Sequence, residues 1–185
     1  PNAVGVTLSM AKFNKILELD AVSRTAQVQC GVRNLAISEA AAPLGLYYAP
    51  DPSSQIACTI GGNVAENSGG VHCLKYGLTL HNIVKIKGFT EVTVKLVPKP
   101  QLARCIMASF DDIRKAGDAV AAVIAAGIIP AGLEMMDKPM TAAVEDYVHA
   151  GYDLTAEAIL LCESDGTPEE VEEEIGRMST VLLAS

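Results

Sequence analysis

The hydrophobic pattern divides the chain into two halves with different rhythms. In the first half, short alternating or apolar runs predict strands over residues 4–10, 16–19, 25–30, 81–86 and 91–97. One helix is expected over 35–44, where Asn34 can cap the first turn and Gly45 can end the last. Between these elements lies a long segment with few large apolar residues.

The second half alternates strands and helices regularly. Strands are predicted over 103–110, 132–136 and 157–163, and helices over 113–126, 138–148 and 168–183. Asp111 or Asp112 can cap the first of these helices, and Thr167 with Glu170 matches a capping box before the last. This order predicts a ferredoxin-like α+β sandwich whose sheet is short of strands. The run Pro98-Lys99-Pro100 suggests a boundary, so we expect domains over 1–97 and 98–185.

The segment 46–84 is the most unusual part of the sequence: LYYAPDPSSQIACTIGGNVAENSGGVHCLKYGLTLHNIV. Small residues dominate at positions where a packed helix or strand would need large hydrophobic side chains. Such a run lets backbone come very close to another group, and a phosphate-bearing ligand is the natural candidate. A short helix over 61–66 is expected to turn free N-terminal amides toward an anion. The residues alone leave open a glycine-rich surface loop, because Gly pairs are common in loops.

Composition and charge narrow the function classes. The net charge of −8 disfavours binding to nucleic acid or to an anionic membrane face. No apolar run is long enough for a membrane span, and the first residues do not resemble a signal peptide. The five scattered cysteines indicate reduced thiols in a cytoplasmic protein. His72, Cys58 and Cys73 match no zinc spacing, so no metal site is expected.

The glycine-rich segment also carries ordered motifs: Asp-Pro, Ile-Gly-Gly-Asn, Asn-x-Gly-Gly and Lys-Tyr-Gly. In this order and spacing the segment resembles FAD-binding flavoproteins of the vanillyl-alcohol-oxidase (PCMH) type, in the branch that oxidises 2-hydroxy acids. The resemblance implies an α+β fold. A partial PCMH-type FAD-binding subdomain would be followed by half of a ferredoxin-like substrate or cap domain, which is the N-terminal part of the FAD-linked oxidase C-terminal domain.

The resemblance implies FAD as the cofactor and assigns its contacts to the glycine-rich segment. Backbone amides would meet the pyrophosphate, glycines without Cβ atoms would allow close approach, and hydroxyl and amide side chains would reach ribityl and phosphate oxygens. The residues implied are Pro52, Ser53, Ser54, Thr59, Ile60, Gly61, Gly62, Asn63, Asn67, Ser68, Gly69 and Gly70.

Departures from the family pattern indicate a fragment with an internal gap. The family's first pyrophosphate loop would lie before Pro1. A long insert that ends in another flavin loop would lie near 87–90, where only Lys87-Gly88-Phe89-Thr90 stands. The second half of the substrate domain, which carries the family's substrate and metal motifs, would lie after Ser185. No residue of this chain is therefore assigned as a catalytic acid or base.

The resemblance implies that the parent protein oxidises a small 2-hydroxy acid, of the glycolate or D-lactate type, to the 2-oxo acid. Electrons would pass to an iron–sulfur subunit or a quinone, beside flavin-bearing partner subunits. The enzyme would be cytoplasmic, and peripheral to the inner membrane only through those partners. Two alternatives stay open. One is an inactive fragment that binds another polypeptide or a second copy of itself, as a homo-oligomer, through edge strands at 103–110 or 157–163. The other is a generic nucleotide-binding or anion-binding module that uses residues 53–70.

Overall fold

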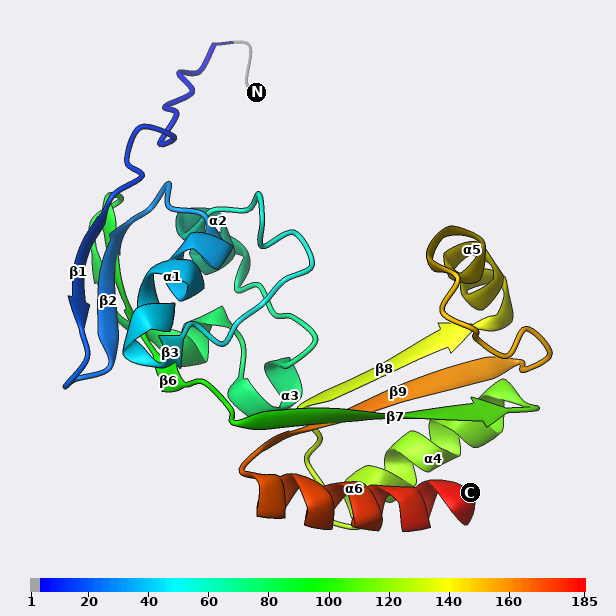
Figure 1. Cartoon of the computed structure of the whole chain (residues 1–185). Coiled ribbons are helices and arrows are strands. Elements are labelled where there is room, and N and C mark those ends of the chain that lie inside the picture. The colour runs from blue at the N-terminus through cyan, green and yellow to red at the C-terminus, as the bar shows by residue number, and fades with distance from the viewer. Residues whose placement is uncertain (1–3) are drawn as a thin grey trace. The chain divides into compact units, whose positions relative to one another are not determined.

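The computed structural model of the chain describes residues 4–185. It divides into two compact units, with the boundary in the chain between Lys99 and Pro100 (Figure 1). Each unit combines helices with an antiparallel sheet, which confirms the α+β class.

The first unit is built on a four-stranded sheet with the order β1-β2-β5-β4. Its strands are β1 (Ile16–Asp20), β2 (Thr25–Gln29), β5 (Glu91–Lys95) and β4 (Ile83–Lys87). Every second residue of β2 and β5 is buried, and Val28 faces Val92 across the ladder. This alternation places one face of the sheet against the core of the unit.

The strand expected over 4–10 is wrong. Residues 4–15 form turns and irregular backbone, and Val4, Val6 and Leu8 are largely exposed. None of the strands among the described residues pairs with this run, so it joins no ladder. The expected hairpin of β1 and β2 is confirmed.

The expected helix after β2 is present as α1 (Asn34–Ala41), continued by the 3-10 turn η1 (Ala42–Leu44) and ended by Gly45 with φ 69°. The capping role expected for Asn34 is wrong, because Arg33 occupies the N-cap position and makes no side-chain cap. Asn34 is instead fully buried inside the first turn. The short strand β3 (Leu46–Tyr47) then pairs with β6 (Val97–Pro98).

The glycine-rich segment contains little regular structure. Its elements are α2 (Ile60–Glu66), α3 (Cys73–Tyr76) and the 3-10 turn η2 (Thr79–Asn82), joined by loops. The chain then enters β4 and turns back into β5 at Gly88, which has φ 54°. The amide of Thr90 closes this turn by donating to the carbonyl of Lys87 at 3.3 Å. Where a longer insert is expected in relatives, the two strands here form a tight hairpin.

The second unit contains a three-stranded sheet with the order β7-β9-β8. Its elements are β7 (Leu102–Phe110), α4 (Ile113–Ala125), β8 (Gly132–Asp137), α5 (Lys138–Val148), β9 (Ala158–Gly166) and α6 (Pro168–Leu183). Helices α4 and α6 cover one face of the sheet, and α5 lies at the end of β8 (Figure 1). The covered face forms a core with Leu160, Cys162, Val123 and Met178.

The caps of the second unit follow the sequence closely. Asp112 accepts a hydrogen bond from the amide of Arg114 at 2.8 Å, and Thr167 with Glu170 forms the expected capping box. The expectation that 157–163 is an edge strand is wrong. β9 lies in the middle of the sheet and pairs antiparallel with both β7 and β8, so the free edges belong to those two strands.

All the cysteines are free thiols, as expected. Among residues 4–185, no helix combines the length and the apolar character needed to cross a bilayer.

Candidate functional site

The first turn of α2 is bonded to the protein itself. Thr59 caps it, and its hydroxyl accepts from the amide of Gly62 at 3.4 Å. The amides of Ile60 and Gly61 each donate at 2.8 Å, to the carbonyls of Val32 and Cys30 respectively. The expectation of free amides that face an anion is therefore wrong. The helix instead uses those donors to bond to the residues that follow β2.

Most glycines of the segment are explained by close packing of the chain on itself. A Cβ atom on Gly61 would lie 2.8 Å from the Cβ of Cys30, and one on Gly69 would lie 2.6 Å from Cδ2 of Leu78. A Cβ on Gly70 would overlap the backbone of Asp51. Gly62 differs, because the nearest atom to its Cβ would be Oγ1 of Thr59 at an ordinary 3.5 Å. Of these glycines, only Gly62 leaves room for something outside the fold.

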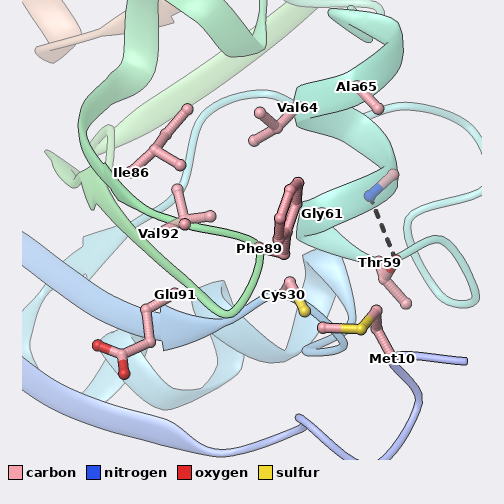
Figure 2. A pocket seen from close by; sticks show the side chains of 12 residues that line it. Met10, Cys30, Thr59, Gly61, Val64, Ala65, Ile86, Phe89, Glu91 and Val92 are labelled. Atoms are coloured by element: carbon pink, nitrogen blue, oxygen red, sulfur yellow. Dashed lines mark hydrogen bonds between the residues drawn. The ribbon is translucent and has the colours of Figure 1, made fainter. Parts of the chain in front are cut away.

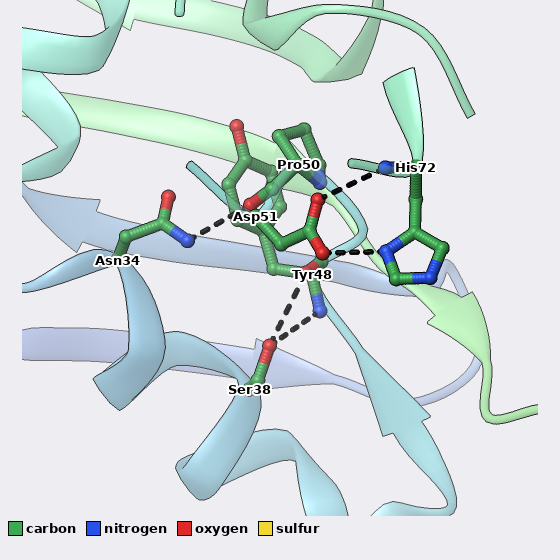
Figure 3. A network of polar contacts seen from close by, with 6 residues as sticks. All are labelled: Asn34, Ser38, Tyr48, Pro50, Asp51 and His72. Atoms are coloured by element: carbon green, nitrogen blue, oxygen red, sulfur yellow. Dashed lines mark hydrogen bonds and ion pairs between the residues drawn. The ribbon is translucent and has the colours of Figure 1, made fainter. Parts of the chain in front are cut away.

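Buried amide side chains connect α1, α2 and the loop between them. Nδ2 of Asn63 donates to Oδ1 of Asn34 at 2.8 Å, and Nδ2 of Asn34 donates to the carbonyl of Pro50 at 2.8 Å. The hydroxyl of Ser38 donates to the carbonyl of Tyr48 at 3.2 Å and accepts from the amide of Tyr48 at 3.0 Å (Figure 3). Both asparagines are almost completely buried. Asn63, expected to contact a ligand, thus donates its amide to the fold.

A carboxylate–imidazole pair holds the next loop. Asp51 accepts from the backbone amide of His72 at 3.4 Å, and its other oxygen lies 2.5 Å from Nδ1 of the same residue (Figure 3). Together with the close approach of Gly70 to Asp51, this pair ties residues 70–72 to the Pro-Asp-Pro turn. Sequence reasoning missed the pair, and the only signal was an aspartate fixed between two prolines.

The remaining expected contacts also lie in self-bonded loops. Asn67 ends α2 in the left-handed conformation, and its Oδ1 accepts from the amide of Leu80 at 2.9 Å. The carbonyl of Ser68 accepts from both the amide and the hydroxyl of Thr79. Pro52, Ser53 and Ser54 form turns before α2, where the carbonyl of Ser54 accepts from Ala57 and Cys58.

Tyr48 carries a buried polar atom that the fold does not satisfy. Its side chain is 2% exposed, and its hydroxyl makes no hydrogen bond of good geometry among the described residues. Burial raises the pKa of this phenol to about 12, although the nearby Thr79 hydroxyl opposes the rise. The phenol is therefore neutral at physiological pH.

A cavity of about 440 Å³ lies between α2 and the β4–β5 hairpin (Figure 2). This volume falls within the roughly 300–1,000 Å³ typical of small-molecule pockets. Of the expected cofactor contacts, Thr59, Gly61 and Gly62 line it. The other lining residues were missed by sequence reasoning: Met10, Cys30, Val64, Ala65, Ile86, Gly88, Phe89, Glu91 and Val92. They come from segments far apart in the sequence, so no local motif could have indicated them.

Comparisons with known families divide the chain as the fold does. The FAD binding domain family matches residues 2–91, and the C-terminal domain of FAD linked oxidases matches residues 99–184. The two matches together cover nearly all of the sequence.

Curated relatives are similar along almost the whole chain. Glycolate oxidase subunit GlcD of Escherichia coli is 54% identical over 99% of this chain and 44% of its own length. The corresponding subunit of Bacillus subtilis is 36% identical over 98% of this chain and 46% of its own. D-lactate dehydrogenase of Anaerostipes hadrus is 29% identical over 97% of this chain and 46% of its own length. The chain thus spans less than half the length of these relatives.

The alignment with the Escherichia coli subunit extends over 218 residues, more than the 185 of this chain, so it contains gaps. Among solved structures, alkyldihydroxyacetonephosphate synthase superposes with a TM-score of 0.81 at 19% identity. That match covers 95% of this chain and 40% of the synthase chain, and it supports the fold alone.

Proposed function

Since the chain belongs to the family of FAD-linked oxidases, we propose that it is part of a flavoprotein that oxidises a small 2-hydroxy acid to the 2-oxo acid. The observation that carries this proposal is the extensive identity with a glycolate oxidase subunit over nearly the entire chain. The similar D-lactate dehydrogenase points to the same substrate class.

The first unit offers a place for part of FAD. Thr59, Gly61 and Gly62 line the cavity, and Gly62 has room for a neighbouring group. Bound there, FAD would supply the hydride acceptor for the oxidation. The chain's own residues would orient the cofactor and exclude water from it, with α2 on one side and the β4–β5 hairpin on the other. The amides of Ile60 and Gly61 are already bonded, so they are poor candidates for holding the pyrophosphate.

The remaining expected contacts act indirectly in this proposal. Asn63, Asn67, Ser68, Gly69 and Gly70 shape the loops that follow α2 through bonds and close contacts within the chain. Pro52, Ser53, Ser54 and Ile60 shape the approach to the same helix. We assign none of them to acid–base chemistry. We also propose that the electrons pass to an iron–sulfur subunit or a quinone. The enzyme would lie peripherally at the inner membrane.

The visible absorbance spectrum provides the test. The purified chain, incubated with FAD and passed through a desalting column, is expected to keep the two-band spectrum of oxidised flavin. Anaerobic addition of glycolate or D-lactate tests the reaction, and bleaching of the bands would show reduction. A chain that stays colourless after incubation with excess FAD would contradict the cofactor proposal. Retained flavin that neither acid bleaches would contradict the activity for this chain.

A further inference from the structure

We propose that two copies of this chain associate by strand exchange, in which residues 5–9 of each copy pair with the open edge of β4 in the other. This association goes beyond the proposed function and does not depend on it. Three features of the first unit support it: an alternating segment without a strand partner, a sheet edge of the same length, and the charges beside that edge.

Residues 5–9 have the side-chain pattern of a strand but pair with no strand among the described residues. Val6 and Leu8 alternate with glycine and hydroxyl side chains, and they are 97% and 78% exposed. The segment leads away from the sheet up to Met10, whose carbonyl accepts from the amide of Phe13 at 2.9 Å (Figure 1). A segment with one apolar side and one polar side can add to a sheet whose faces have the same division.

β4 offers an edge of matching length. It is the last strand in the order β1-β2-β5-β4, it has five residues, and among the described residues it pairs only with β5. Its other side is therefore open to a further strand. Val84 and Ile86 are both about half exposed there. Ile86 lies opposite the buried Val92, so an added strand would find an apolar neighbour on the core face of the sheet.

The charges of β4 favour a neutral partner strand. Lys85 and Lys87 lie on the outward face, opposite polar residues of β5. Two β4 strands paired with each other would bring lysines together, and like charges directly opposite destabilise a ladder. Lys87 is paired with Glu91 at 3.2 Å, so Lys85 provides most of this repulsion. Residues 5–9 carry no charge, and their hydroxyls would lie beside the lysines while their apolar side chains continue the face of Ile86.

Reciprocal exchange gives a closed dimer. Each copy would donate one segment and accept one, so the two contacts are related by a two-fold axis. Both β4 edges are then covered, and no edge of this kind is left for a third copy.

Sedimentation velocity of the full chain over a range of concentrations measures the association. We expect a concentration-dependent dimer with twice the 19.4 kDa mass of one chain. Leu8→Lys in the donor and Ile86→Lys in the acceptor should each raise the dimer dissociation constant roughly tenfold or more, because a charge would be buried beside an apolar strand. Val22→Lys places the same charge on a 96% exposed residue of the β1–β2 turn, outside both strands, and should leave the dimer unchanged.

Mixing the two variants tests strand exchange itself. Leu8→Lys keeps an intact β4 edge and Ile86→Lys keeps an intact donor segment, so a mixed dimer retains one of the two contacts. We expect each variant alone to be monomeric at a concentration where their mixture contains dimers. Circular dichroism should show that each variant folds, and Val84→Lys serves as the acceptor variant if Ile86→Lys does not.

Several outcomes would overturn the proposal. A wild-type chain that stays monomeric, a dimer that Leu8→Lys leaves intact, or a mixture as monomeric as its separate variants would each do so. Protection of residues 5–9 from hydrogen exchange in the monomer would also contradict it, since the segment would then pair within its own chain.

Discussion

The two units provide hydrogen-bond partners for their backbones in different ways. In the second unit, β7 and β8 each pair along their length with β9, and hydrogen bonds of the ladder need no particular side chain. In the first unit, the loops around α2 rely on single contacts such as Asn34 with Pro50 and Asp51 with His72. Glycines therefore have different roles in the two units. Near α2 the glycines allow close packing of the chain, whereas Gly117 inside the regular helix α4 (Ile113–Ala125) has no such neighbour and only weakens the helix.

The largest expected effect is the loss of core packing in the regular unit. Leu160 is fully buried in the core shared by β9, α4 and α6, so Leu160→Ala should destabilise this unit by about 2–5 kcal/mol. Hydrogen exchange read by mass spectrometry can follow peptides from each unit separately. Faster exchange is expected in β7, β9 and α6, with little change in β2 and β5. Equal acceleration in both units would show that they do not unfold independently.

The next largest effect on stability is expected at Gly70, which packs against the backbone of Asp51. Gly70→Ala should destabilise the first unit by about 1–3 kcal/mol, because the added methyl group would overlap Asp51 and the loop must move. Gly62→Ala is the matched control, since its methyl group would meet only Thr59 at contact distance. Urea unfolding monitored by circular dichroism would measure both variants. Equal loss of stability in the two would contradict the account of Gly70.

The smallest expected effect is a gain in stability rather than a loss. Gly117 lies within α4, and an added Cβ would meet nothing within 4 Å. Gly117→Ala should stabilise the second unit by about 0.5–1 kcal/mol, because alanine loses less backbone entropy in a helix. A higher unfolding midpoint in urea is the expected measurement. A lower midpoint would mean that Gly117 serves a contact of the kind seen at Gly70, and the contrast between the units would fail.

Local rules were sufficient for most of the second unit. The capping box of Thr167 and Glu170, the cap at Asp112 and the helices that follow them were predicted from residues a few positions apart. The central strand of the sheet was not predicted correctly, because strand pairing depends on contacts between segments that are distant in the sequence. The sequence placed β9 at an edge, and the structure places it at the centre.

The glycine-rich segment shows the same division for the site. Its motifs alone identified the family and its cofactor class, because their order and spacing are specific. They indicated Thr59 as a ligand contact, whereas the structure shows that Thr59 caps α2. Only the tertiary structure decided what each small residue faces. It turned the amides of Ile60 and Gly61 toward the segment 30–32 that follows β2, and it brought Phe89 and Met10 to the cavity from far along the chain. The physical reason is that spacing constrains neighbours along the chain, while the partner of a glycine or an amide is chosen by the packing of segments that the sequence separates.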